Sequence, residues 1–128
     1  MAGLEVHAHM KVRPGQLEGF KKQAAELVRL TKEKDSRTLR YDWFVGRDGT
    51  ECEVHEAYVD SEGLMEHNAN ISEARGELFA HFAGDHFMTF YGEVSPELVE
   101  LVEAMRRDGH LRAAWFSFLD GLESPSAA

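Results

Sequence analysis

Two short stretches of the sequence contain side chains suited to acid–base chemistry. Residues 53–67 read EVHEAYVDSEGLMEH, which places Glu56 and Tyr58 two positions apart and His67 further along. Near the N-terminus, His7 and His9 form an H-x-H pair. Imidazole changes charge near neutral pH, a carboxylate can orient a histidine or hold a substrate hydroxyl, and a phenol can donate a hydrogen bond. We therefore take His7, His9, Glu56, Tyr58 and His67 as candidate catalytic residues.

Other roles are open to the same side chains. An H-x-H pair on a strand can bind a metal ion if Glu56 or Asp42 supplies a third ligand, but no second metal motif accompanies it. We therefore predict no metal and interpret the pair as acid–base groups or polar groups lining a wet cleft. Glu56 could instead be structural, paired with Arg40 or Arg13 or bonded across a dimer.

Motifs for bound cofactors and for a reactive cysteine are lacking in the sequence. There is no Gly-rich phosphate loop, no G-x-S-x-G and no flavin or nicotinamide fingerprint, so we predict no bound cofactor. The one cysteine, Cys52, stands between two glutamates, whose negative charge disfavours a thiolate nucleophile.

Composition excludes several classes of partner. The 128 residues carry 14 basic and 23 acidic side chains, a net charge of −9, and no basic surplus for nucleic acid or an anionic membrane. A single cysteine gives no intramolecular disulfide, and neither a signal peptide nor an apolar run of about 20 residues is visible. These features predict a cytoplasmic protein.

The first half of the chain predicts a strand, a helix and a hairpin. Residues 4–12 alternate strictly between apolar and polar side chains, which is typical of a strand with one face in a core. Apolar residues at helical spacing follow from Leu17 to Thr31. Residues 38–47 and 51–59 predict two strands joined at Asp48-Gly49.

The second half predicts two further helical regions and a fourth strand. Asp60 or Ser61 can cap a short helix, which we expect to break around 68–70, before a second helical piece that ends at Gly84. Residues 86–94 predict a strand. Ser95-Pro96 opens another helix that stops at Gly109, and 110–119 is a fifth strand or a covering segment.

This order predicts an α+β protein with a ferredoxin-like βαββαβ antiparallel sheet and helices on one face. We assign residues 1–95 to that domain, and residues 96–128 to a C-terminal helix and apolar extension that packs on the same domain or on a dimer partner. The other sheet face would be left bare, which predicts a homodimer packed sheet against sheet.

The pattern Glu56-x-Tyr58-x-Asp60-Ser61-Glu62-x-Leu64-x-x-His67 resembles the antibiotic biosynthesis monooxygenase (ABM) family of dimeric α/β-barrel proteins. Val12-x-Pro14-Gly15 and Tyr41-Asp42-Trp43 fit the same family, and the resemblance covers roughly residues 4–94. It implies a cofactor-independent monooxygenase that acts on a small aromatic quinol or phenol.

Two alternatives remain open: a non-catalytic module that binds a small apolar ligand, and a haem-degrading monooxygenase. The haem-degrading members of the family that this chain resembles have Trp where this chain has Tyr58. They have Asn on the first strand, where this chain has His7 and His9.

For the site itself, we expect Glu56, Tyr58 and His67 to line one cleft with His7 or His9. This expectation places Glu56 and Tyr58 on the bare sheet face, together with Val54. Tyr41 and Trp43 are the more apolar set of their strand, and we expect them under the helices; we expect His81 and His86 to be structural.

Overall fold

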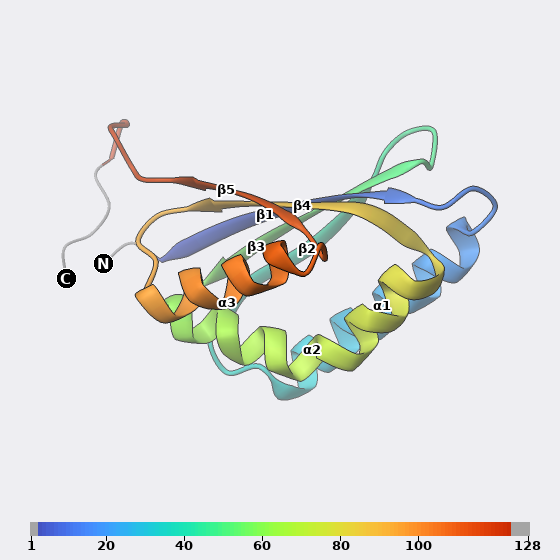
Figure 1. Cartoon of the computed structure of the whole chain (residues 1–128), viewed down its shortest axis with the longest axis horizontal. Coiled ribbons are helices and arrows are strands. Elements are labelled where there is room, and N and C mark those ends of the chain that lie inside the picture. The colour runs from blue at the N-terminus through green and yellow to red at the C-terminus, as the bar shows by residue number, and fades with distance from the viewer. Residues whose placement is uncertain (1–2, 124–128) are drawn as a thin grey trace.

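The computed structural model describes residues 3–123, which form one sheet covered by helices on a single face (Figure 1). The strands are β1 Leu4–Val12, β2 Thr38–Val45, β3 Glu51–Tyr58, β4 Ala83–Tyr91 and β5 Arg112–Phe116. Their order in the sheet is β2-β3-β1-β4-β5. The pairs β2·β3, β3·β1 and β1·β4 are antiparallel, and β5 runs parallel to β4. The predicted ferredoxin-like arrangement is confirmed.

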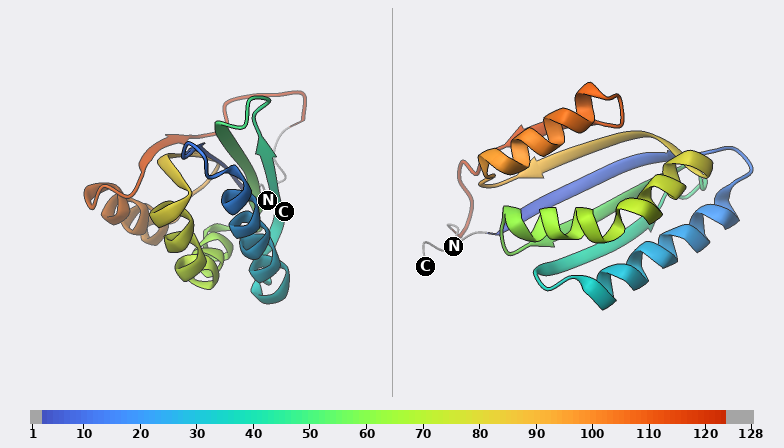
Figure 2. Two further views of the ribbon diagram at one scale, coloured as in Figure 1. Left: turned by 90° about the vertical axis from the view of Figure 1, so that its right-hand side faces the viewer. Right: turned by 60° about the horizontal axis from the view of Figure 1, so that its bottom comes forward.

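The helices are α1 Leu17–Lys34, α2 Ser61–His81 and α3 Pro96–Arg107. They lie side by side across the sheet with α2 between α1 and α3 (Figure 2). No helix within residues 3–123 is long and apolar enough to cross a membrane.

Strand β1 is the central strand of the sheet, and apolar and polar side chains alternate along it. Its five apolar residues are all buried beneath the helices: Leu4, Val6, Ala8, Met10 and Val12. Because successive strand residues point to opposite faces, His7 and His9 lie on the face without helices.

Helix α2 is one continuous helix of 21 residues, so the predicted break at 68–70 is wrong. Asparagine disfavours a helix when its side chain competes for the local backbone. Here Asn70 donates to Asp35 and Asn68 accepts from Arg75, so both side chains have partners elsewhere. The predicted cap is correct, since Asp60 Oδ1 accepts from the Gly63 amide at 2.9 Å.

The chain after α2 differs from expectation by a few residues. The helix ends at His81 and β4 begins at Ala83, so Gly84 lies within the strand and does not end the helix. The start of α3 is as predicted: Ser95 Oγ accepts from the Leu98 amide, and Pro96 occupies the first turn. The segment that follows forms β5, the first of the two forms expected for it.

The register of β1 against β3 decides which side chains share a face. Leu4 pairs with Tyr58 and Val6 pairs with Glu56, and residues paired across strands point the same way. Glu56, Tyr58 and Val54 therefore face the helices, and the prediction that they share the bare face with His7 or His9 is wrong. Cys52 and Val54 have the same parity as Glu56, and their burial carries the whole set inward.

The neighbouring strand β2 follows the same logic. Tyr41 pairs with Glu56 and Trp43 pairs with Val54, so both aromatic side chains pack under the helices as predicted.

Candidate functional site

A cavity of about 50 Å³ lies between the sheet and the helices, with lining side chains from β1 to β4 and from all three helices. Most of the lining is apolar, including Met10, Val54, Ile71 and Leu98. The polar lining residues are Tyr41, Trp43, Glu56, His67, Asn68, Arg75 and His86.

Glu56 is the carboxyl group of the cavity. It is 5% exposed, and Tyr58 Oη donates to its Oε1 at 2.5 Å. Burial raises the pKa of Glu56 to about 7, although the Tyr58 hydrogen bond and the positive charge of Arg75 act in the opposite direction. A carboxyl group with that pKa can both take up and release a proton near neutral pH.

Tyr58 lies behind Glu56 and does not line the cavity. It is fully buried, and burial together with the nearby Glu56 charge raises the pKa of its phenol well above the usual value. Tyr58 therefore remains a neutral donor that holds the Glu56 carboxylate in place.

His67 is oriented by Asp35, a residue that precedes β2. Its Nδ1 lies 2.7 Å from Asp35 Oδ2, and the two side chains are 3% and 2% exposed. Asp35 also accepts from Thr38 Oγ1 at 2.6 Å and from Asn70 Nδ2 at 2.8 Å. Burial lowers the pKa of His67, so the imidazole is neutral at pH 7 and Nδ1–H donates to Asp35, which leaves Nε2 as an acceptor.

Two aromatic residues of β2 complete this side of the cavity. The Tyr41 ring meets the His67 ring edge to face with 4.5 Å between centroids, and it meets Trp43 at 5.8 Å. Trp43 Nε1 is buried without a hydrogen-bond partner in residues 3–123. The indole N–H is therefore a free donor beside the cavity, available to a water molecule or a ligand oxygen.

The opposite side of the cavity carries positive charge. Arg75 donates through Nη1 to Asn68 Oδ1, which lies seven residues, about two helical turns, earlier on α2. Burial lowers the pKa of Arg75, but the guanidinium remains charged. His86 stacks on Phe79 at 4.4 Å, and burial lowers its pKa to about 3, so it is neutral.

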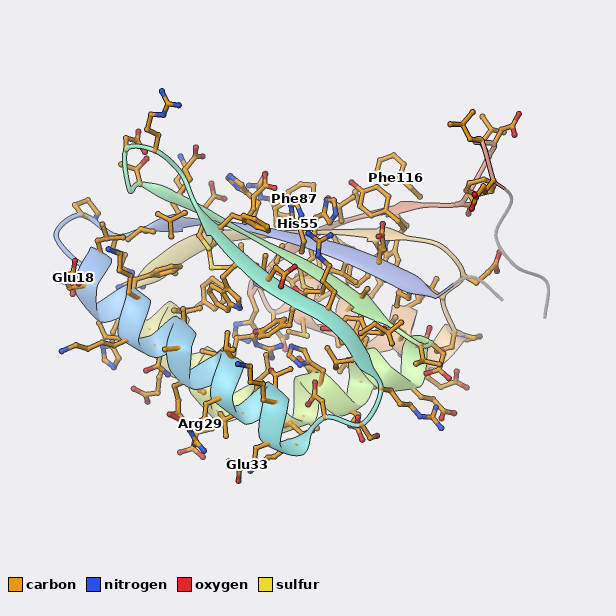
Figure 3. The ribbon with its side chains drawn as sticks, turned by 180° about the vertical axis from the view of Figure 1, so that it is seen from behind. Glu18, Arg29, Glu33, His55, Phe87 and Phe116 are labelled. Atoms are coloured by element: carbon orange, nitrogen blue, oxygen red, sulfur yellow. The ribbon has the colours of Figure 1, made fainter. Side chains whose placement is uncertain are left out.

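His7 and His9 do not reach this cavity, because they lie on the open face of the sheet. There His7 stacks on His55 at 4.1 Å, and ring contacts continue across all five strands. We call this row the aromatic band; from β2 to β5 it consists of Phe44, His55, His7, Tyr91 and Phe116. Figure 3 shows His55, Phe87 and Phe116 on this face. Arg29 and Glu33 project from α1 on the opposite side of the molecule.

The structure thus brings together three of the five candidate catalytic residues, Glu56, Tyr58 and His67, and separates them from His7 and His9. Sequence reasoning missed Asp35 and Arg75. Asp35 stands in a run of alternating charges that reads as a solvated helix end, and only the tertiary contact with His67 distinguishes it. Arg75 had a usable signal, since it follows Ile71 by four residues and so shares its inward side of the helix. Within residues 3–123 no group of three potential metal ligands is gathered in one place.

Comparison with known proteins identifies relatives of this fold. The sequence profile of the antibiotic biosynthesis monooxygenase family matches residues 4–93. No protein of curated function matches the chain in sequence.

Solved structures show the same architecture. The crystal structure of MupZ from Pseudomonas fluorescens is 22% identical with a TM-score of 0.75, and the match covers 100% of this chain and 99% of MupZ. The match with Rv0793 from Mycobacterium tuberculosis (18% identity, TM-score 0.63) covers 73% of this chain and 97% of the Rv0793 chain. The match with a crystal structure of an antibiotic biosynthesis monooxygenase (23% identity, TM-score 0.64) covers 72% of this chain and 99% of that monooxygenase chain. The likeness to MupZ therefore extends through α3 and β5, beyond the residues that the family profile matches.

Proposed function

Because this chain belongs to the antibiotic biosynthesis monooxygenase family, we propose that it is a cofactor-independent monooxygenase acting on a small phenol or quinol in the cavity beneath α2 and α3. The observation that carries the proposal is Glu56, a buried carboxyl group with a pKa of about 7 in an otherwise largely apolar cavity. Such a group is suited to take the proton of a bound hydroxyl.

The proposed reaction starts with proton transfer from the substrate hydroxyl to the Glu56 carboxylate. The resulting electron-rich anion reduces dioxygen; one oxygen atom enters the product as a quinone carbonyl, and the other leaves as water. The substrate supplies all the electrons, so no additional reductant is needed. Arg75 contributes a positive charge near the anion, and buried charges interact more strongly than exposed ones.

The remaining polar groups have supporting roles in this proposal. Tyr58 positions Glu56 through its hydrogen bond. His67 presents Nε2 as a second proton acceptor because Asp35 holds Nδ1. Trp43 Nε1 can donate to a substrate oxygen. We leave His7 and His9 out of the catalytic site because the sheet separates them from Glu56.

Haem fits this cavity poorly. His67 is the histidine that could bind iron, but its ring is buried and its Nδ1 is held by Asp35. Titration with haemin should therefore give no Soret shift.

The assembly we propose is a homodimer formed through the open sheet face. Phe44, Tyr91 and Phe116 of the aromatic band are 48%, 37% and 56% exposed there. Removing apolar surface from water contributes about 25 cal/mol per Å², so a second copy packed on this face would be stabilising. Val54 and Tyr58, which we expected on this surface, lie under the helices instead.

Oxygen uptake with a panel of phenols and quinols tests the catalytic proposal. We expect uptake by the unmodified protein and a loss of at least about a hundredfold in Glu56→Gln, because a neutral amide cannot accept the proton. Glu77→Gln, on the exposed side of α2, is the matched control. A protein that binds a small aromatic tightly but consumes no oxygen would instead be a ligand-binding module.

A further inference from the structure

The cavity opens between α2 and α3, and Arg75 lies at this opening. Lining residues from the central strands, such as Met10 and Val54, are fully buried, whereas Tyr41 and Trp43 of the edge strand β2 and Met88 of β4 are partly exposed. Among the lining residues of the two helices, Asn68 and Arg75 of α2 and Leu101 and Met105 of α3 are partly exposed. The opening is therefore polar and positively charged on one side and apolar on the other.

Arg75 is the one arginine within residues 3–123 that is not exposed, and no carboxylate lies within 4.0 Å of it. Five exposed arginines have a carboxylate within 4.0 Å: Arg29, Arg37, Arg40, Arg106 and Arg112. The more buried Arg75 has none in residues 3–123, and its one side-chain hydrogen bond there goes to the neutral Asn68 amide. A buried charge without a partner is costly, so this arrangement favours an anion supplied by a ligand.

We propose that Arg75 binds the carboxylate of an apolar carboxylic acid, whose body extends under Leu101 and Met105 toward Glu56. This inference rests on the proposed function, because the hydroxyl that Glu56 deprotonates belongs to the same acid. A guanidinium matches the two oxygens of a carboxylate with parallel hydrogen bonds. One guanidinium neutralises one charge, which fits a carboxylate and leaves a phosphate dianion half compensated. The apolar lining fits an acid with an aromatic body.

Calorimetric binding without oxygen tests this inference independently of turnover. The probes are 4-hydroxybenzoate, 3-(4-hydroxyphenyl)propionate and their methyl esters at pH 7.5. We expect the unmodified protein to bind at least one acid about tenfold or more tightly than its ester, because charge-assisted hydrogen bonds are lost in the ester.

Arg75→Gln should lose this preference while keeping its affinity for the ester, which shows that the cavity is still folded. Arg75→Lys should restore part of the preference, and Arg107→Gln, an exposed residue at the end of α3, should leave it unchanged. The inference is overturned if no acid binds, if the unmodified protein does not distinguish acid from ester, or if Arg75→Gln keeps the preference. If the acids bind through Arg75 but no oxygen is consumed, this inference stands and the oxygenase proposal fails.

Discussion

Tyr58 Oη donates to Glu56 Oε1 at 2.5 Å from a position two residues further along the same face of β3. This contact joins two fully enclosed side chains and is the local reason why the Glu56 carboxylate has a fixed orientation. It also stabilises the ionised form of Glu56 against the effect of burial.

Tyr58→Phe should raise the pKa of Glu56 without disturbing the fold. The variant keeps the ring and removes the donor, and a hydrogen bond to a charged group is worth about 1.5 kcal/mol, which corresponds to about one pH unit. We expect the rising limb of the pH profile of kcat/KM to move to higher pH by about that amount. A profile that keeps its midpoint in Tyr58→Phe would show that Tyr58 does not act through Glu56.

The unfolding free energy of Glu56→Gln, measured relative to that of the unmodified protein, should be higher at pH 8 than at pH 4.5. The pKa of Glu56 is raised from 4.5 to about 7, so the folded state holds its proton more tightly than the unfolded state. The contribution of Glu56 to the free energy of unfolding therefore falls by about 3 kcal/mol as pH rises from 4.5 to 7, and it stays level above pH 7. Gln does not titrate, so the difference between the two proteins should follow this curve.

Denaturant unfolding at pH 4.5, 6 and 8 measures this difference. Other titrating groups, such as His67 and His86, are common to both proteins and cancel to first order. An unfolding free energy difference that is the same at all three pH values would mean that Glu56 ionises normally.

Asp35→Asn should destabilise the protein and release His67. The carboxylate accepts from His67, Thr38 and Asn70, and an amide turns one acceptor oxygen into a donor. We expect a loss of about 2–3 kcal/mol in the free energy of unfolding, since a buried donor is left unpaired. Nitrogen NMR of His67 should also show a change of tautomer. Asp42→Asn, on the exposed edge strand β2, is the control and should leave the His67 signal unchanged.

Phe44→Asp should convert the proposed homodimer to a monomer. Phe44 is 48% exposed at the β2 end of the aromatic band, and a buried aspartate in the interface would lack a partner. Sedimentation of the unmodified protein at micromolar concentration should give twice the chain mass. Ala25→Asp, on the exposed side of α1, changes the charge equally and should remain dimeric. An unmodified protein that sediments as a monomer would contradict the assembly.

The element order could be predicted from sequence because it depends on local signals. Alternation in β1, the Asp48-Gly49 turn and the caps at Asp60 and Ser95 each appear as predicted. The face of β3 was predicted wrongly, although its apolar residues Cys52, Val54 and Tyr58 lie on the same side as Glu56. The pairing of Val6 with Glu56 places that side under the helices. Long-range partners such as Asp35 for His67 leave no local pattern, because their value appears only when the chain has folded.

The assignment of Glu56 as the proton acceptor is tested most directly by the pH dependence of oxygen uptake with the best phenol substrate. In the unmodified protein, kcat/KM should rise with pH and level off with an apparent pKa near 7, as the Glu56 carboxylate forms. Glu56→Gln should show a low rate across the range, while Glu77→Gln follows the unmodified protein. A Glu56→Gln protein that turns over at the unmodified rate would contradict the account.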